Sequence, residues 1–551
     1  MTACRAQALP ESRAARDGYL LALDAGTGSC RAALFTVGGQ LAALAQREWS
    51  HPPAGGIPGS QSFDPAGNWA LICACIREVL GSAPSPAAVR AVGCSSMGGG
   101  LVLYGRGRQE LWACANGDTR AEREAAVMLA DGTAAELYRR GGGWITLSAA
   151  PRLAWVRRHQ PAVWAAAARL SLIADWMVFR LTGTLATEAS IGSTSGLFDL
   201  GRRAWSPELL MLCGLEPSLF PEVVEAGTVV GQVSGAAFSH TGLAPGTPVV
   251  AGGLDTALGL AGPRPAVPGQ LTVTGGSFWK QTVVTQAPAV EPAGRLRTIC
   301  HVRPGQWLVE GIGFYAGFAL RWLRDRAAAG RPAGRTAGYA ELEELAAAVP
   351  PGAGGLTARL VPADAWAWAG WQPPFPPPPG GLGEQAGLGG QAGQAGLGEH
   401  ATPNAQAGLG EQVRAIQEAA AYSTRRAAGL VSELLGPGAW QEVILTAGAA
   451  RSRLWPQILA DVLGHRVGVP EHTESAARGA ASLAGRAAGL LPEDPPPGPP
   501  AGPPPGPRPD DAGHDVPGLD RATCPSPARQ RAYDQLYARW QSAAPGSRGA
   551  T

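Results

Sequence analysis

The segment from Asp24 to Arg31, DAGTGSCR, joins two apolar, strand-like runs and combines small residues with hydroxyl-bearing and charged ones. Asp24 lies at the end of the first run and is a candidate to hold Mg²⁺ through water, while Arg31 can pair with a phosphate group. The residues between them let backbone N–H groups and hydroxyls approach an anion closely: Gly26, Thr27, Gly28 and Ser29. The segment is neither GxxxxGKS/T nor GxGxxG ahead of a helix, so an ordinary hairpin turn is equally open.

Asp255 is the second candidate, because it follows the apolar run PVVA and two glycines. A carboxylate in a turn just past the end of a strand is well placed to accept a proton from a substrate hydroxyl. In isolation, a structural role for Asp255 in a turn or a helix cap is the more ordinary interpretation.

Two further small-residue turns follow apolar strands later in the chain, at Gly275–Ser277 and Gly448–Ala450. Either turn alone would be taken as structural. Their recurrence with the first two, at four strand ends in two halves of the chain, favours a shared role in binding.

Strands and helices alternate along the chain, which favours an α/β fold. A helix is predicted near residues 65–80, with Asp64 as its N-cap, and a strongly amphipathic helix over residues 413–435. Two successive cycles of strands, glycine turns and helices indicate two similar domains around a cleft. We expect the first domain over residues 18–261 and the second over residues 262–490.

The glycine and proline content separates these domains from low-complexity segments. The 551 residues include 77 Gly and 49 Pro, roughly twice the usual share, but without the period of collagen. A hydrophobic content of 45% and 17 Trp predict a sizeable core. We expect a flexible leader at 1–17, a low-complexity insertion at 372–412, a Pro-rich linker at 491–517 and a terminal helix within 518–546 that packs on the body.

Charge and cysteine content exclude several classes of protein. With 45 basic and 43 acidic residues the formal charge is +2, so a nucleic-acid footprint is not expected. All basic residues but one are arginine, and any lysine-dependent chemistry must therefore use Lys280. The nine cysteines contain no CxxC pair, which argues against a zinc cluster and indicates reduced thiols. The chain has no signal-peptide pattern and no apolar run of about 20 residues, which predicts a cytoplasmic protein without membrane contact and leaves a homodimer open.

The motifs occur in the order found in the FGGY carbohydrate kinases, which the chain resembles from about Tyr19 to Gly489 and in its terminal helix. The resemblance rests on DAGTGSCR at 24–31, DW and LTG within 175–183, GLD at 253–255, EG, AG and RWLRD within 310–325, and WPQILAD at 455–461. It implies two actin/hexokinase-like (ribonuclease H-like) domains around a catalytic cleft.

The resemblance also implies ATP and Mg²⁺ as cofactors and transfer of the γ-phosphoryl group to a hydroxyl of a small-molecule substrate. Asp255 would be the general base, and Asp24 would help hold Mg²⁺. Nucleotide contacts are implied in both domains, for Gly26, Thr27, Gly28, Ser29, Arg31, Gly275, Gly276, Ser277, Gly317, Gly448 and Ala449. The substrate-side candidates are Gly98, Gly99, Asp118, Arg120 and Trp279 beside Asp255, with a structural ion pair as the alternative for Asp118 and Arg120.

Within the family, WACAN at 112–116 and GSFW at 276–279 resemble the branch that phosphorylates autoinducer-2, a hydroxypentanedione. That branch carries an Arg-Glu pair where this chain has Gly98 and Gly99, while Ala257 stands where a glutamine is frequent. The expected substrate is autoinducer-2 or a related sugar. Xylulose, ribulose or glycerol is the alternative substrate, and a weakly active or inactive ligand-binding protein is the alternative function.

Overall fold

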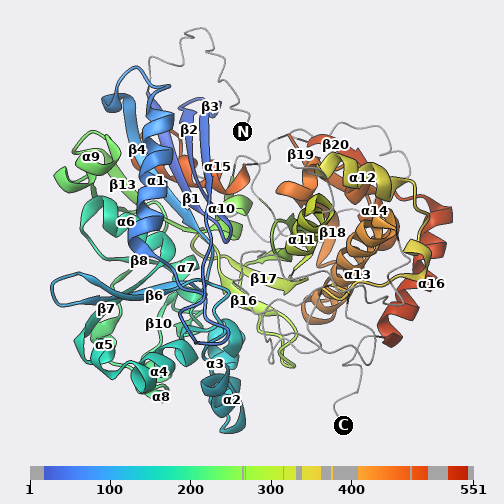
Figure 1. The fold of residues 1–551 in the computed structure, drawn as a ribbon, viewed down its shortest axis with the longest axis horizontal. Helices are drawn as coiled ribbons and strands as arrows, with labels where there is room; N and C mark the ends of the chain where they lie inside the picture. The colour runs from blue at the N-terminus through green and yellow to red at the C-terminus, as the bar shows by residue number, and fades with distance from the viewer. Residues whose placement is uncertain are drawn as a thin grey trace.

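The computed structural model describes residues 18–262, 266, 269–313, 315–329, 338–360, 374–375, 408–471, 474–493 and 519–543. The predicted leader and most of the predicted insertion and Pro-rich linker lie outside the described residues. The described residues form two lobes, each built on a mixed β-sheet (Figure 1).

The sheet of the first lobe has six strands in the order β12-β13-β4-β1-β2-β3. The strands are β1 (Tyr19–Ala25), β2 (Ser29–Thr36), β3 (Leu41–Glu48), β4 (Val89–Ser96), β12 (Val229–Gln232) and β13 (Pro248–Leu254). Since β1, β4 and β13 are parallel neighbours, their carboxyl ends meet at one edge of the sheet. Gly26, Gly98 and Asp255 each follow one of these ends within two residues.

Both faces of this sheet are covered by helices. Leu21 and Leu23 of β1 pack on the side of α1 (Pro65–Leu80) and α6 (Ile173–Thr182). Leu20 and Ala22 face α10 (Asp255–Ala261) and α15 (Ser475–Ala487), since successive strand residues point to opposite faces. α15 lies within the residues predicted to form the second domain, and it packs on β1, β4 and β13 of the first lobe (Figure 1).

Smaller elements complete the first lobe. They are the strands β5 (Leu101–Gly105), β6 (Glu110–Cys114), β7 (Ala167–Leu172), β8 (Thr187–Glu188), β9 (Phe198–Asp199), β10 (Ala204–Trp205) and β11 (Val223–Val224), and the helices α2 (Glu122–Ala130), α3 (Thr133–Gly141), α4 (Ala149–His159), α5 (Pro161–Ala166), α7 (Ala189–Ser193), α8 (Pro207–Leu212) and α9 (Gly235–Thr241). The strands β5, β6 and β7 form a three-stranded sheet. α7 reaches the second lobe, where the backbone N–H of Cys300 donates to Ser193 Oγ at 3.0 Å.

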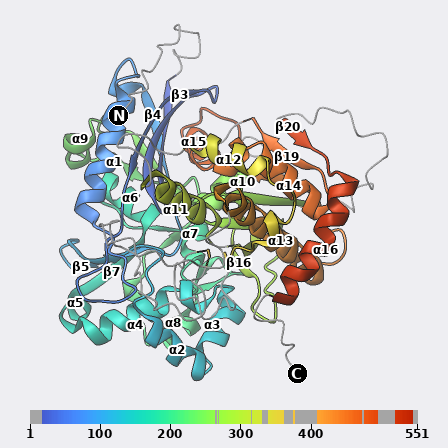
Figure 2. The same ribbon diagram turned by 45° about the vertical axis from the view of Figure 1, so that its right-hand side comes forward.

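The sheet of the second lobe has seven strands in the order β16-β17-β15-β14-β18-β19-β20. They are β14 (Gly269–Gly275), β15 (Trp279–Thr285), β16 (Arg297–Cys300), β17 (Trp307–Ile312), β18 (Trp440–Thr446), β19 (Val467–Pro470) and β20 (Leu519–Thr523). The helices are α11 (Ala316–Ala329), α12 (Tyr339–Ala347), α13 (Leu409–Leu435), α14 (Leu454–Leu463) and α16 (Pro527–Ala543). α13 is largely buried against β15 and β17, with α11, α12 and α14 beside it, and α16 lies at the edge of the lobe against α14 (Figure 2).

Several predicted elements occur close to their expected bounds. Asp64 caps α1, its Oδ1 accepting from the Ala66 N–H at 3.1 Å, and Pro65 occupies the first turn. α13 begins at Leu409, so the last residues of the predicted insertion are helical. The terminal segment contains β20 as well as α16, and that strand was not expected.

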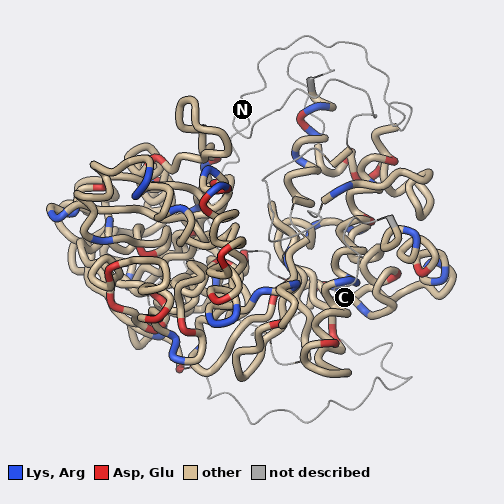
Figure 3. The backbone as a smooth tube through the Cα atoms, turned by 90° about the horizontal axis from the view of Figure 1, so that it is seen from below, with Lys and Arg blue, Asp and Glu red and all other residues tan. Residues whose placement is uncertain are grey.

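Basic and acidic residues are interspersed over both lobes (Figure 3), as the nearly balanced charge predicts. Among the described residues, no helix is both long and apolar enough to cross a membrane.

Gly93→Ala is expected to destabilise the protein by about 1–3 kcal/mol, because overpacking a filled interface has that typical cost. A Cβ at this position of β4 would lie 2.3 Å from the backbone oxygen of Ala480 in α15. The control is Gly55→Ala, where a Cβ would meet nothing within 4 Å. Thermal unfolding measures both variants, and equal midpoints would contradict the close packing of α15 on β4.

Candidate active site

A cavity of about 690 Å³ opens between the two lobes. The predicted site residues that line it are Asp24, Gly26, Thr27, Gly28, Ser29, Arg31, Gly98, Gly99, Asp255, Gly275, Gly276, Ser277, Gly317, Gly448 and Ala449. All four small-residue turns therefore reach the same space, although the individual roles of these residues remain predictions.

The turn between β1 and β2 presents its backbone to the cavity. Asn116 Nδ2 donates to the Thr27 hydroxyl at 3.0 Å. A Cβ on Gly28 would lie 2.9 Å from Nη1 of Arg321, which extends from α11 in the other lobe. The absence of a side chain at Gly28 thus lets a cation of the second lobe approach the turn.

Asp24 is buried near the end of β1, and no described residue donates a hydrogen bond to its buried Oδ1. Its Oδ2 lies 3.7 Å from Nη1 of Arg31, which also contacts Glu474 at 3.2 Å. Burial raises the pKa of Asp24 to about 6, and the positive charge of Arg31 only partly opposes this shift. Asp24 lines the cavity, and a carboxylate at this position fits a ligand for a divalent cation or its bound water.

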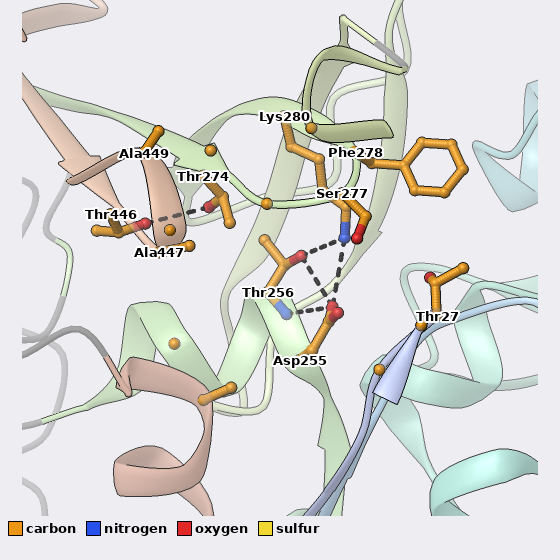
Figure 4. A pocket seen from close by; sticks show the side chains of 18 of the residues that line it. Thr27, Asp255, Thr256, Thr274, Ser277, Phe278, Lys280, Thr446, Ala447 and Ala449 are labelled. Carbon is orange, nitrogen blue, oxygen red and sulfur yellow. Dashed lines mark hydrogen bonds and ion pairs between the residues drawn. The ribbon is translucent and has the colours of Figure 1, made fainter. Parts of the chain in front are cut away.

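Asp255 is the first residue of α10, directly after β13, and not the turn residue that the sequence suggested. Its Oδ1 accepts from the Thr256 N–H at 2.6 Å, the Thr256 hydroxyl at 3.1 Å and Lys280 Nζ at 3.3 Å (Figure 4). None of the described residues donates to Oδ2, and the side chain is 31% exposed. One carboxylate oxygen is therefore fixed, and the other is available to a ligand.

A buried carboxylate supports the strand end that carries Asp255. Ser190 Oγ accepts from the Leu254 N–H at 3.0 Å and donates to Glu188 Oε2 at 2.5 Å. Glu188 Oε2 also accepts from the backbone N–H groups of Ser190 and Ile191 at 2.8 and 3.1 Å. Burial raises the pKa of Glu188 to about 7 against the effect of these donors. The group acts on Asp255 only through the backbone of Leu254.

The turns of the second lobe pack so closely that larger side chains do not fit. A Cβ on Gly317 would lie 2.1 Å from the backbone oxygen of Gly276, and one on Gly275 would lie 2.3 Å from Ala449 Cβ. Since β14 and β18 are parallel neighbours, Gly275 and Thr446 end adjacent strands at the cavity. This geometry suits close contact between the backbone and a nucleotide.

Two profiles from one family match most of the chain. The N-terminal domain of the FGGY family of carbohydrate kinases matches residues 19–262, and its C-terminal domain matches residues 276–488. The chain belongs to the FGGY family of carbohydrate kinases.

Similar proteins and structures agree with this assignment. The chain is 38% identical over 488 residues to an autoinducer-2 kinase from Yersinia enterocolitica, covering 86% of this chain and 87% of that protein. It is 35% identical over 540 residues to an autoinducer-2 kinase from Klebsiella pneumoniae, covering 95% and 93%. A xylulose kinase from Rhodospirillum rubrum aligns with a TM-score of 0.70 at 25% identity, covering 95% and 98%. A gluconate kinase from Lactobacillus acidophilus aligns with a TM-score of 0.74 at 17% identity, and the alignment covers 96% of this chain and 98% of that protein. At this identity the likeness shows the fold alone.

The predicted fold and class of activity are therefore confirmed. The protein is an ATP-dependent carbohydrate kinase with two actin/hexokinase-like domains around a cleft.

In this FGGY kinase the space beside Gly98 is already filled. A Cβ there would lie 2.8 Å from Thr194 Cγ2 and 3.0 Å from Leu254 Cδ1. Gly99 has a φ of +86°, which favours glycine, and its backbone oxygen accepts from the Arg152 guanidinium. The backbone at these positions is thus built for glycine, and polar contacts to a substrate must come from other residues.

Three predicted substrate contacts do not line the cavity. Asp118 and Arg120 form a buried ion pair at 2.6 Å, and the Arg120 guanidinium lies 5.2 Å from the centre of the Trp112 ring. Trp279 is fully buried in the core of the second lobe, where its Nε1 donates to Thr424 Oγ1 at 2.8 Å. Asp118 and Arg120 therefore form the structural ion pair that was the alternative to substrate contact. Trp279 lies in the core behind the cavity and does not reach it.

The residues that sequence reasoning did not assign to the site include Thr194, Glu188, Ser190, Arg321, Lys280, Asn116 and Thr256. Glu188, Ser190 and Thr194 stand in no motif and reach the site only through the packing of α7. Lys280 carried a signal in being the single lysine of the chain.

Ser190→Ala is expected to lower kcat by about fivefold while leaving the KM for ATP unchanged, because about 1 kcal/mol is typical for one hydrogen bond. The variant removes the hydroxyl between Leu254 and Glu188 and loosens the strand end before Asp255. Steady-state ADP release measures both constants. Ser239→Ala, an exposed serine on α9, is the matched control, and a kcat like that of the parent in Ser190→Ala would contradict the positioning role.

Proposed function

We propose that this kinase transfers the γ-phosphoryl group of ATP to a hydroxyl of a small polyhydroxylated carbonyl compound, with autoinducer-2 as the first candidate. The observation that carries the proposal is Asp255, whose Oδ1 is held by three donors while Oδ2 stays free in the cavity. The relatives named autoinducer-2 kinase, at 35% and 38% identity over most of the chain, support the choice of acceptor.

Asp255 Oδ2 accepts the proton of the substrate hydroxyl as its oxygen attacks the γ-phosphorus. Thr27, Gly28 and Arg31 contact the phosphates from the first lobe, and Gly275–Ser277 contacts them from the second. The adenosine lies beside Gly317, Gly448 and Ala449. The lobes exclude water around the reacting groups, which limits the hydrolysis of ATP.

Mg²⁺ fits beside Asp24, because the buried Oδ1 of that residue has no hydrogen-bond donor among the described residues. The ion supplies charge neutralisation on the phosphate oxygens. Asp24 holds it directly or through water, and its position at the end of β1 keeps the carboxylate close to the phosphate-facing turn.

The substrate binds against the wall formed by Gly98, Gly99, Asn116 and Thr194. Asn116 and Thr194 are the polar side chains of this wall, and we expect them to contact a substrate hydroxyl. Xylulose, ribulose and glycerol remain alternative acceptors, and the likeness to a xylulose kinase supports the first of them. We expect the reaction to take place in the cytoplasm, where ATP is available. The homodimer stays a prediction.

Asp255→Asn is expected to reduce kcat by about 100-fold or more, because an amide cannot accept the hydroxyl proton. ADP release is measured with ATP·Mg²⁺ against autoinducer-2, xylulose, ribulose, erythritol and glycerol. The parent should turn over one of these acceptors preferentially, and ATP binding by calorimetry should be similar in parent and variant. Binding of ATP by the parent without turnover of any acceptor would instead favour a ligand-binding protein on a kinase fold.

The Mg²⁺ concentration needed for half-maximal ADP release should rise by about tenfold from pH 7 to pH 5. A carboxyl with a pKa of about 6 is mostly ionised at pH 7 and mostly protonated at pH 5. The required Mg²⁺ concentration rises as the pH falls because only the ionised form of Asp24 attracts the cation. Asp24→Asn should need more Mg²⁺ at both pH values but lose this additional dependence, and the same pH dependence in parent and variant would exclude Asp24 as the ligand.

A further inference from the structure

Lys280 is the only lysine among the 551 residues, and it lines the cavity beside Asp255. It is the second residue of β15, the strand that follows the turn at Gly275–Ser277. Its side chain is only 15% exposed. Nζ donates to Thr256 Oγ1 at 2.6 Å and to Asp255 Oδ1 at 3.3 Å (Figure 4). Since Asp255 and Thr256 belong to the first lobe, this contact crosses the cavity at the reacting centre.

The other cations that line the cavity are engaged elsewhere. Arg31 and Arg451 pair with Glu474 at 3.2 and 3.0 Å, and Arg297 pairs with Glu310 at 2.6 Å. Arg321 lies against Gly28 in the turn of the first lobe. Among the described cations that line the cavity, Lys280 is therefore the one paired with the general base.

The chemistry of an ammonium group suits this position better than that of a guanidinium. A guanidinium forks onto both oxygens of a carboxylate, whereas an ammonium acts as a compact point charge on a flexible stem. Lys280 contacts Oδ1 and leaves Oδ2 of Asp255 available. Its Nζ can therefore contact a neighbouring phosphoryl oxygen without blocking the base.

We propose that Lys280 is a catalytic residue whose ammonium contacts an oxygen of the transferred γ-phosphoryl group and neutralises charge during the transfer. The proposal rests on the assignment of Asp255 as the general base. A hydroxyl bound to Oδ2 attacks a phosphorus about 3–3.5 Å away in a reactive complex. The phosphoryl group then lies between Asp255 and the turn at Gly275–Ser277, which is where the stem of Lys280 ends.

The step conserves atoms and charge. The substrate oxygen gives its proton to Asp255 Oδ2 and forms a bond to the γ-phosphorus, while the bond to the bridging oxygen of ATP breaks. The electron pair of that bond leaves with ADP. Lys280 stays protonated throughout, so it supplies only positive charge and hydrogen bonds.

Lys280→Met is expected to lower kcat by about 100- to 1,000-fold, the usual effect of removing one donor to a developing negative charge. The affinity for ATP, measured by calorimetry, should stay within about threefold of the parent, because the contact strengthens only in the transition state. Lys280→Ala should regain activity in added methylamine, and Lys280→Arg should stay impaired because its fork competes for Asp255. Arg139→Met, which removes an exposed cation on α3, is the matched control for lost charge.

A kcat of Lys280→Met near that of the parent, or a loss in Lys280→Ala that methylamine does not recover, overturns the proposal. Acetylation gives an independent measurement, since Lys280 carries the only side-chain amine of the chain. ATP·Mg²⁺ should slow both acetylation of Lys280, read by peptide mass, and the loss of activity. An active Asp255→Asn would refute the general base itself, whereas an inactive Asp255→Asn beside a fully active Lys280→Met would refute only the role of Lys280.

Discussion

The site depends on close approach of backbone segments that come from different parts of the chain. At Gly275 the neighbouring strand end approaches so closely that a Cβ would lie 2.3 Å from Ala449, and at Gly317 it would lie 2.1 Å from Gly276. Such contacts leave backbone groups, instead of side chains, at the surface of the cavity, which suits the nucleotide contacts proposed for these turns. Phosphoryl transfer relies mainly on positioning and charge, so a rigid backbone surface is an appropriate way to supply both.

Close backbone packing also joins the two lobes, through α15. α15 covers one face of the first sheet although its sequence neighbours belong to the second lobe, and Gly93 has no space for a side chain beneath it. Glu474 precedes this helix and pairs with Arg31 of the first turn and with Arg451 of the second lobe. Glu474 therefore links charged groups of both lobes at the edge of the cavity.

Short sequence motifs predict which residues lie at the ends of strands. They do not predict which distant side chains are brought together by tertiary packing. Asp24, Asp255 and the four turns could be found because each small-residue turn follows its own apolar strand. Trp279 and Lys280 are adjacent on β15, and the alternation of a strand turns Trp279 into the core and Lys280 into the cavity. Glu188 reaches the catalytic strand only through Ser190, and this contact depends on tertiary packing that no local spacing reveals.

The wall at Gly98 and Gly99, beside the strand end that carries Asp255, indicates how substrate preference can diverge while the phosphate chemistry is retained. Thr194 and Leu254 occupy the space beside Gly98, and Arg152 is committed to the backbone oxygens of Gly99 and Asn116. The polar groups left on this wall are then side chains such as Asn116, which lines the cavity. A polyol that relied on charged partners at the two glycine positions would lose them, and buried polar groups without partners are costly. A small acceptor with few hydroxyls loses least, which is the physical reason to favour a compact carbonyl compound over a longer sugar.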